Sequence, residues 1–253
     1  MVDIHSHVVP QVDDGSKSLQ DSLDMIKNVS KNGIKTIVAT THYMNGKYEV
    51  QRKDLEAKVH SLNQILKMNN IDIKVLLGQE IMVDINIFDL LDKGIIGSIN
   101  NSRYILIEFD MNNEIANLDI IIKRFKSLGY TPIIAHPERY RYVANDIDIV
   151  KKWINSGALL QMNLGSISGI HGSSAQKTLI KLLNENLIHM WGSDLHSFRD
   201  TYKDFDSHLT ALKKVVKDKN IYDDIINNNA RVILDEEIKL HPKAKKRGLF
   251  SFK

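Results

Sequence analysis

Residues 2–7 read VDIHSH, in which the short apolar run Val2 to Ile4 leads directly into His5 and His7. Alternate residues of an extended chain point to the same side, so both imidazoles can reach one cation. Two surface histidines at this spacing can also arise by chance. The pair therefore indicates a metal site only if other strand ends bring further ligands to the same place.

Short apolar runs recur along the chain, and longer amphipathic segments separate them. This alternation is typical of repeated βα units around a parallel sheet, so we expect an α/β fold. The predicted strands are Val2 to Ile4, Thr36 to Thr40, Ile73 to Leu77, Tyr104 to Phe109, Thr131 to Ala135, Leu159 to Asn163 and Ile188 to Trp191. The predicted helices between them include Leu19 to Asn32, Arg52 to Asn69 and Asn117 to Leu128.

Side chains that can bind a metal follow six of these seven runs. In (β/α) barrels the active site gathers at the carboxyl ends of the strands. The candidate ligands at these ends are His5, His7, His42, Glu80, Glu108, His136, Asp194 and His196. The remaining run ends near Asn163, which offers a polar amide at the corresponding place. A charged group beside an apolar strand is costly to desolvate unless it is paired or bound to metal. A buried salt bridge is the alternative interpretation.

The turn Asp13-Asp14-Gly15-Ser16 follows the first strand. One interpretation is that Asp or Ser caps the next helix. Another is that one aspartate points at the site, and Asp14 is then the candidate. With Asp14 the chain offers about nine ligands, more than one four- to six-coordinate ion can use. We therefore expect two or three ions. The histidines expected not to be ligands are His60, His171, His189, His208 and His241.

The stretch AHPER, residues 135–139, places a histidine, a carboxylate and an arginine just past a strand. A guanidinium presents a planar fork of donors that suits phosphate oxygens, so Arg139 is expected to bind substrate and stabilise the transition state. The alternative is a structural ion pair between Arg139 and Glu138. Arg199 follows the last ligands closely enough to line the same mouth, and it is a second catalytic candidate.

The composition excludes several classes of protein. The chain of 253 residues has no cysteine, which excludes disulfides, thiolate metal sites and a cysteine nucleophile. A net charge of +3 is too small to indicate a nucleic-acid partner. Neither a signal segment nor a membrane-spanning run is present, so a cytoplasmic protein is expected. Residues 1–240 are predicted to form one domain and residues 241–253 a flexible basic tail, usually a solvated end but also suited to an anionic membrane or an acidic partner.

Taken in order, the motifs HSH, DDGS, GQE, IEF, AHPER and GSDLH resemble those of the polymerase and histidinol phosphatase (PHP) superfamily. Within it they look most like the manganese-dependent tyrosine-protein phosphatases of bacterial capsule and exopolysaccharide loci. The resemblance runs from residue 1 to about residue 235. It implies a distorted, TIM-like (β/α)7 barrel with a trinuclear centre. Mn²⁺ is the metal that it implies, with Fe, Zn and Mg as alternatives.

The resemblance also implies roles for single residues. The family pattern places one ion among His5, His7, Glu80 and Asp194. Glu80 would bridge to a second ion held by Glu108 and His136, and Asp14, His42 and His196 would hold the third. Arg139 matches the family's phosphate-contacting arginine.

The function that these expectations describe is hydrolysis of phosphotyrosine on a bacterial tyrosine autokinase that regulates polysaccharide export. The partner kinase would bring the protein to the inner face of the membrane. Bound cations would lower the pKa of a bridging water toward ~7 and so supply hydroxide for attack on phosphorus. One alternative is a PHP phosphoesterase for a small molecule such as histidinol phosphate, because the metal centre does not encode the leaving group. The other is a non-catalytic metal-binding protein that regulates a kinase by docking.

Overall fold

The computed structural model describes residues 1–198 and 201–241. Within this part of the chain, seven parallel strands lie side by side in sequence order and form a nearly closed barrel. The strands are β1 (Val2–Ser6), β2 (Thr36–Tyr43), β3 (Lys74–Met82), β4 (Tyr104–Glu108), β5 (Thr131–Ala135), β6 (Leu159–Asn163) and β7 (Met190–Gly192). The predicted α/β barrel is confirmed.

Backbone hydrogen bonds close the barrel at the carboxyl ends of its first and last strands. The Asp194 amide donates to the His5 carbonyl at 2.9 Å, and the His7 amide donates to the Leu195 carbonyl at 2.9 Å. Ser6 and Leu195 form a parallel bridge at the same place. The closure therefore brings residues from the two ends of the chain to one edge of the barrel.

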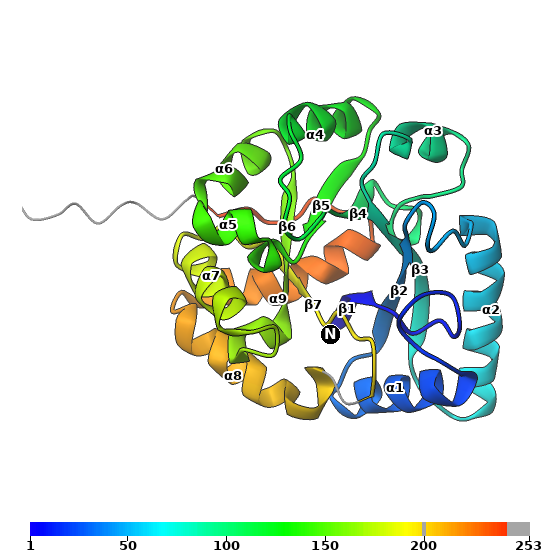
Figure 1. Ribbon diagram of the computed structural model, residues 1–253. Coiled ribbons are helices and arrows are strands. Elements are labelled where there is room, and N and C mark those ends of the chain that lie inside the picture. Colours follow the sequence, from blue (N-terminus) through cyan, green and yellow to red (C-terminus); the bar gives the residue numbers. More distant parts are fainter. Residues whose placement is uncertain (199–200, 242–253) are drawn as a thin grey trace, which may run out of the picture.

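Most helices lie outside the ring of strands, as Figure 1 shows. They are α1 (Leu19–Lys31), α2 (Arg52–Met68), α3 (Ile87–Asp92), α4 (Leu118–Ser127), α5 (Arg141–Asn145), α6 (Asp148–Asn155), α7 (Ser173–Asn184), α8 (Phe205–Val215) and α9 (Lys219–Ile233). Short 3-10 turns lie at Ile99–Asn101, Pro137–Arg139, Leu164–Ser168 and Thr201–Asp204.

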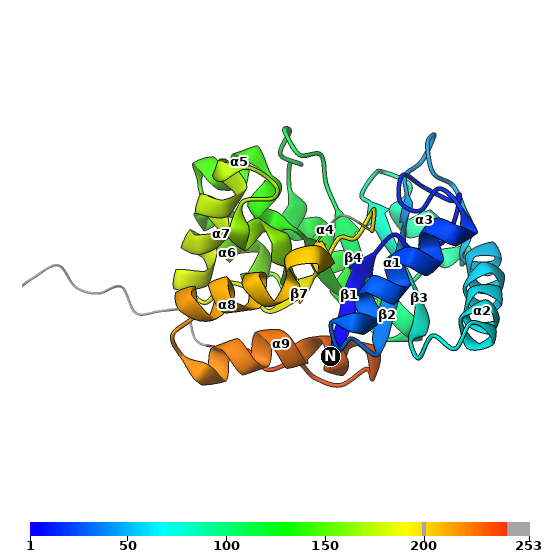
Figure 2. The ribbon, with the colours of Figure 1, turned by 90° about the horizontal axis from the view of Figure 1, so that it is seen from below.

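Helix α9 lies across the end of the barrel where the strands begin, as Figure 2 shows. The side-chain Nδ2 of Asn229 donates to the Val2 and Trp191 carbonyls, both at 2.8 Å. Val232 of the same helix is fully buried. The amino end of the barrel is therefore covered, and the carboxyl end is left for a functional site.

The half of the barrel interior nearer the strand beginnings is apolar, with at least one buried side chain from each strand. These include Ile4, Val38, Leu76, Leu106, Ile133, Leu159 and Met190. Side chains two or four residues apart on a strand share a face. His42 and Glu80 therefore face the interior four residues beyond Val38 and Leu76. The inward face of β2 and of β3 is therefore apolar in the first part of the strand and carries a metal-capable group near its end.

A bulge in β1 alters this alternation. Asp3 pairs with Ile37, whereas Ser6 pairs with Ala39, so β1 has one more residue than β2 between these pairs. Ile4 lies in the apolar interior, yet the next residue, His5, also contacts the ligands inside the barrel. Bulges commonly redirect a side chain beside an active site.

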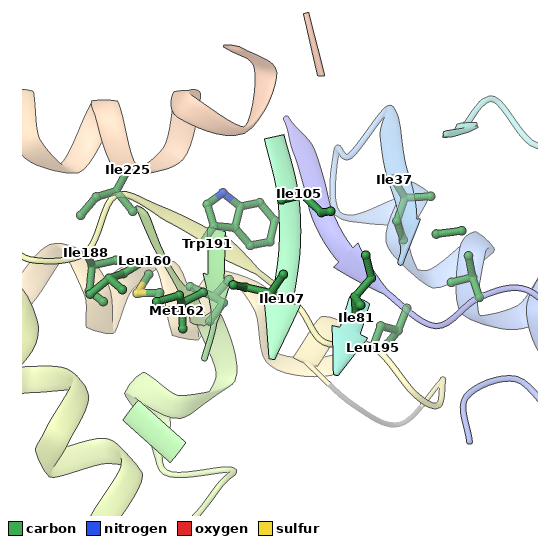
Figure 3. Close-up of a cluster of buried hydrophobic side chains, with 14 of the residues drawn as sticks. Ile37, Ile81, Ile105, Ile107, Leu160, Met162, Ile188, Trp191, Leu195 and Ile225 are labelled. Carbon is green, nitrogen blue, oxygen red and sulfur yellow. The ribbon is translucent and has the colours of Figure 1, made fainter. Parts of the chain in front are cut away.

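The outward faces of the strands pack against the helices in a larger hydrophobic cluster. Figure 3 shows part of it, including Ile37, Ile107 and Trp191. All three side chains are fully buried. Burial of an apolar side chain of this size stabilises the fold by about 1.5–3 kcal/mol. These contacts hold the barrel on which the ligands are mounted.

All seven predicted strands are present, but several boundaries were wrong. β1 runs to Ser6, two residues further than predicted, so His5 lies within it. β2 runs to Tyr43 and β3 to Met82, so His42 and Glu80 lie within strands and not after them. The last strand begins at Met190, two residues later than predicted. The three predicted helices end within one residue of the observed α1, α2 and α4.

The predicted basic tail, residues 241–253, lies outside the described residues except for His241, whose Nε2 lies 2.9 Å from Asp224 Oδ2. Within the described residues, no helix is long and apolar enough to cross a membrane.

Candidate metal centre

The nine predicted ligands converge at the carboxyl end of the barrel. Eight of them form three overlapping groups in which one ligand atom from each residue lies within 4.8 Å of the others. The groups are His5, His7, Glu80 and Asp194; His7, Asp14, His42 and His196; and His42, Glu80 and Glu108. The ninth residue, His136, lies beside them with Nε2 at 2.9 Å from Glu80 Oε1.

Glu80 lies at the centre of this arrangement and is fully buried. Its Oε2 lies 3.1 Å from His5 Nε2, 3.3 Å from His7 Nε2 and 3.2 Å from His42 Nδ1, while its Oε1 faces His136. A carboxylate that contacts four imidazoles through its two oxygens could serve as a ligand to two neighbouring cations.

His42 also lies between two groups. Its Nδ1 is 2.9 Å from Glu108 Oε1, and its Nε2 is 3.5 Å from Asp14 Oδ1. The resemblance assigns His42 to the ion of Asp14 and His196, and His136 to the ion of Glu80 and Glu108. In the structure His136 lies further from Glu108 than His42 does. The distance from His136 Nε2 to Glu108 Oε2 is 3.9 Å.

Several buried ligand atoms in this centre have no hydrogen-bond partner. They are Glu80 Oε2, Glu108 Oε1 and His42 Nδ1. A buried polar atom without a partner is costly, and native proteins rarely leave one. Here both carboxylate oxygens lie close to His42 Nδ1, Glu80 Oε2 at 3.2 Å and Glu108 Oε1 at 2.9 Å. Because imidazole and carboxylate donors without thiolate suit Mn, Fe or Zn, the residues present fit a site for divalent cations.

The acid–base behaviour of the cluster indicates a strong attraction for positive charge. Burial opposes protonation of His5, yet the Glu80 and Asp194 carboxylates outweigh it and raise the pKa of His5 to about 9. Burial alone would raise the pKa of Glu80, but the nearby His5 and His42 hold it well below its usual value. Burial would also raise the pKa of Asp194, but His5 and His7 keep it low. Divalent cations would meet the same attraction.

Three neighbouring groups fix the orientation of the histidines. His7 Nδ1 lies 2.8 Å from Asp13 Oδ2, and His5 Nδ1 lies 2.8 Å from Gln161 Oε1. His196 Nδ1 lies 2.9 Å from the Asp194 carbonyl oxygen. Each contact is made through Nδ1, so the Nε2 atom of each histidine faces the centre. Such outer partners set the tautomer and ring orientation of metal-bound histidines.

Sequence reasoning missed the roles of Asp13 and Gln161. The DDGS turn was the signal for Asp13, but neither aspartate caps α1, because Ser18 is the cap and accepts from the Asp21 amide at 3.1 Å. Instead Asp13 supports His7 and accepts from the His42 amide at 3.0 Å, while Asp14 faces His42 and His196. Gln161 lies in a buried strand position that carries no local signal.

Gly15 allows this turn to lie against the first strand. A Cβ atom at Gly15 would lie 2.2 Å from the His7 carbonyl oxygen and 2.4 Å from the His7 Cβ. Any larger residue at position 15 would therefore displace His7.

Two ligand candidates have left-handed backbone conformations. His136 has φ 35° and Asp194 has φ 55°. A residue other than glycine seldom adopts such values, and the strain is often found at functional sites. Both residues directly follow or lie just past the end of a strand, where the chain turns sharply to aim the side chain into the barrel.

Arg139 lies at the mouth of the centre with its side chain 31% exposed. Its Nη1 donates to Asp194 Oδ2 at 2.8 Å, and Asn163 Nδ2 donates to the same oxygen at 2.7 Å. The alternative pairing with Glu138 was wrong, since the buried Glu138 carboxylate accepts from the Asn163 amide and the Ser166 hydroxyl. The second catalytic candidate, Arg199, lies outside the described residues.

The five remaining histidines make other contacts. His60 pairs with Gln64, His189 Nδ1 accepts from the Leu160 amide, and His208 pairs with Ser168. Among the described residues, none of the five belongs to a group that could hold a metal ion.

A cavity of about 310 Å³ opens onto the candidate ligands. Its lining includes Asp14, His42, Glu80, Glu108, His136, Arg139, Asp194 and His196. The remaining lining comes mainly from methionine and aromatic side chains. A molecule in this cavity would therefore meet the metal-capable groups and the Arg139 guanidinium together.

Comparison with known proteins agrees with this arrangement. Residues 1–235 match the model of the family described as capsular polysaccharide synthesis, CpsB/CapC. The tyrosine-protein phosphatase YwqE of Bacillus subtilis is 32% identical over 100% of both chains. The tyrosine-protein phosphatase CpsB of Streptococcus pneumoniae is 29% identical over 94% of this chain and 100% of its own.

A solved structure shares the whole architecture. It comes from the crystal structures of YwqE from Bacillus subtilis and CpsB from Streptococcus pneumoniae, which are described as unique metal-dependent tyrosine phosphatases. The TM-score is 0.91 at 30% identity, covering 96% of this chain and 98% of that chain.

Proposed function

The chain belongs to the CpsB/CapC family of capsular polysaccharide synthesis, and from this membership we propose that it is a metal-dependent protein-tyrosine phosphatase. The observation that carries the proposal is the convergence of nine candidate ligands at the carboxyl end of the barrel, seven of which line one cavity with Arg139. A chain without cysteine needs another route to hydrolysis, and a multinuclear centre offers one.

The residues would share two or three divalent cations, with Mn²⁺ the metal proposed. Glu80 would join the ion among His5, His7 and Asp194 to a neighbouring ion beside Glu108. When bound, these cations supply Lewis acidity that lowers the pKa of water and offsets charge on a phosphoryl group. The side chains of Glu108, His136, Asp14, His42 and His196 complete the ligand set.

Arg139 would bind the phosphoryl oxygens of the substrate. Its guanidinium is held by Asp194, yet it is partly exposed and has further donors to offer. A planar fork of donors suits the equatorial oxygens of phosphate, whose charge spreads in the transition state. Asn163 donates to the same oxygen of Asp194, and so helps to hold the carboxylate in place.

The tyrosine leaving group makes modest demands on the protein. A phenol has a pKa near ~10, so it leaves with less help from a proton donor than an alkyl alcohol would. This fits a centre in which the described residues provide ligands and a phosphate-binding arginine and need no dedicated acid.

The proposed substrate is a phosphotyrosine on a bacterial tyrosine autokinase that controls capsular or exopolysaccharide synthesis. Support comes from the family, which is one of capsular polysaccharide synthesis. Such a partner would bring the enzyme to the inner face of the membrane. Arg199, which lies outside the described residues, stays a second catalytic candidate in this proposal.

Two alternatives make different predictions. A phosphoesterase for a small molecule such as histidinol phosphate would prefer that compound to a phosphotyrosine peptide. A non-catalytic metal-binding regulator would bind a kinase but turn over neither compound.

The test is a substrate panel on protein stripped of metal and then given Mn²⁺, Mg²⁺ or Zn²⁺. A phosphotyrosine peptide, a phosphoserine peptide of the same sequence and histidinol phosphate are compared by phosphate release. The proposal predicts preference for the phosphotyrosine peptide with Mn²⁺. Preference for histidinol phosphate would overturn the proposed substrate, and absence of turnover with every metal would overturn the proposed activity.

A further inference from the structure

The cavity above the candidate metal centre has two chemically different sides. Arg139 and His136 follow β5, and Asp194 follows β7, so the Arg139 guanidinium lies on the side of the later strands. Beyond their ligands, the neighbouring strands β2, β3 and β4 contribute mainly methionine and aromatic side chains, together with Lys47, Asp110 and Asn112. A phosphate ester bound with its phosphate at the ligands would lay its organic group against these side chains.

The apolar side follows a simple pattern in the chain. Met44 lies two residues beyond His42, and Met82 lies two residues beyond Glu80. Met82 pairs in register with Glu108 of β4. Met111 follows three residues beyond Glu108 and lines the same cavity. All three methionines are half-buried, so part of each side chain remains available for contact.

Tyr48 completes this side and is fixed relative to the centre. Its ring lies nearly parallel to that of His42, with 14° between the planes and 5.8 Å between the centroids. Lys47 Nζ lies 4.7 Å from the Tyr48 ring centroid. The turn that carries Tyr48 is closed by two backbone hydrogen bonds of 2.8 Å between Met44 and Tyr48.

The floor of the cavity is also held in place. Phe109 is fully buried, and its amide donates to the Tyr140 hydroxyl at 3.2 Å. In the next turn Asp110 Oδ1 accepts from the Asn112 and Asn113 amides at 2.8 and 2.7 Å. Both turns that border the apolar side are therefore ordered before any ligand arrives.

We propose that Tyr48, Met44, Met82 and Met111 form an aryl-binding wall that selects esters of aromatic alcohols for this site. Aromatic rings pair favourably with one another and with the sulfur of methionine. The wall would contact the phenol ring of phosphotyrosine, whereas the shorter side chain of phosphoserine would leave it uncovered. This inference rests on the proposed phosphatase function and names the feature that sets its substrate class.

The test uses phosphonates, which are not hydrolysed and so remove the difference between leaving groups. Phenylphosphonate and methylphosphonate are titrated by calorimetry into Mn²⁺-loaded wild-type protein and the variants Tyr48→Ala, Tyr48→Phe and Met68→Ala. Met68 is 80% exposed at the end of α2, which makes it a matched control for an apolar side chain outside the cavity. The Mn²⁺ stoichiometry of each variant checks that the centre is intact.

The wall predicts that wild-type protein binds phenylphosphonate more tightly than methylphosphonate. The selectivity is the Kd for methylphosphonate divided by the Kd for phenylphosphonate. Tyr48→Ala reduces this ratio about tenfold, which corresponds to about 1.4 kcal/mol. Tyr48→Phe keeps the ring and keeps the ratio within about twofold of wild type, as Met68→Ala does. An unchanged ratio in Tyr48→Ala, with Mn²⁺ stoichiometry intact, overturns the wall and leaves the phosphatase function standing. If the wild-type protein binds neither phosphonate and also hydrolyses no phosphate ester, the proposed function itself is overturned.

Discussion

His42 of β2 and Glu80 of β3 are register partners on neighbouring parallel strands, and His42 Nδ1 lies 3.2 Å from Glu80 Oε2. Partners in register on adjacent strands place their side chains on the same face of the sheet. The pairing therefore brings a base and an acid together inside the barrel without any loop. The candidate metal centre is thus built partly into the sheet itself, where its geometry is rigid.

Substitution of the central carboxylate should remove more than one ion. Glu80 faces four histidines, and Glu80→Gln keeps its size while it removes the charge that two neighbouring ions would share. We expect bound Mn²⁺ to fall to at most about one ion per chain and phosphotyrosine turnover to fall below about 1% of wild type. Elemental analysis after gel filtration measures the first and phosphate release the second. Glu56→Gln, at an exposed position of α2, is the control. Equal metal content in the Glu80 and Glu56 variants would contradict the bridging role.

The partner of His7 should affect metal affinity without being a ligand. In Asp13→Asn the carboxylate that contacts His7 Nδ1 at 2.8 Å loses its charge, so the ring is held less firmly in the tautomer that presents Nε2. We expect the Kd for Mn²⁺ to rise about 10–100-fold. Competition with a fluorescent chelator measures it. Asp72→Asn serves as the control because its side chain is 88% exposed and pairs only with Lys35 among the described contacts. The two variants should differ, and matching affinities would refute the role of Asp13.

Loss of the arginine at the mouth should affect substrate and not metal. Arg139→Ala removes the donors that would meet phosphate, and Arg139→Lys keeps a charge but not the planar fork. We expect kcat/KM for a phosphotyrosine peptide to fall about 100-fold in Arg139→Ala and less in Arg139→Lys, with Mn²⁺ content unchanged. Steady-state kinetics with the neighbouring exposed Arg141→Ala as control measures this. If Arg139→Ala keeps the wild-type kcat/KM, Arg139 does not bind phosphate.

Metal binding should release protons at neutral pH. The Glu80 and Asp194 carboxylates outweigh burial and raise the pKa of His5 to about 9, so this imidazole is protonated at pH 7 in the metal-free protein. A histidine must be neutral to bind a metal ion, hence the apparent affinity for Mn²⁺ should fall as the pH is lowered from about 9 to 7. Calorimetry in buffers of different ionisation enthalpy counts the protons released. His60→Gln, on the exposed side of α2, should release the same number. An affinity that is constant from about pH 7 to 9 would contradict this linkage.

Much of the fold and the convergence of the candidate ligands could be predicted from the sequence because both depend on short-range patterns. Apolar runs with polar ends marked every strand, and the residues at those ends, from His5 to His196, meet in space because parallel strands share one carboxyl edge. The length of β2 and β3 was underestimated for the same reason, since His42 and Glu80 are polar enough to resemble the residues that follow a strand.

Features that depend on long-range contacts could not be predicted. The bulge that turns both Ile4 and His5 into the barrel follows from the register of β1 against β2. Gln161 reaches His5 across 156 positions of sequence, and no local pattern marks it. Tyr48 stacks on His42 only because the turn after β2 folds back over the strand end.

The most direct test of the account is a titration of chelator-treated protein with Mn²⁺, in which bound metal and phosphotyrosine turnover are followed together. The account predicts no turnover in the stripped protein, and full turnover only after about two ions have bound, since one ion cannot use the ligands that meet at Glu80. Full turnover by the stripped protein, or by protein that holds a single ion, would contradict a multinuclear hydrolytic centre.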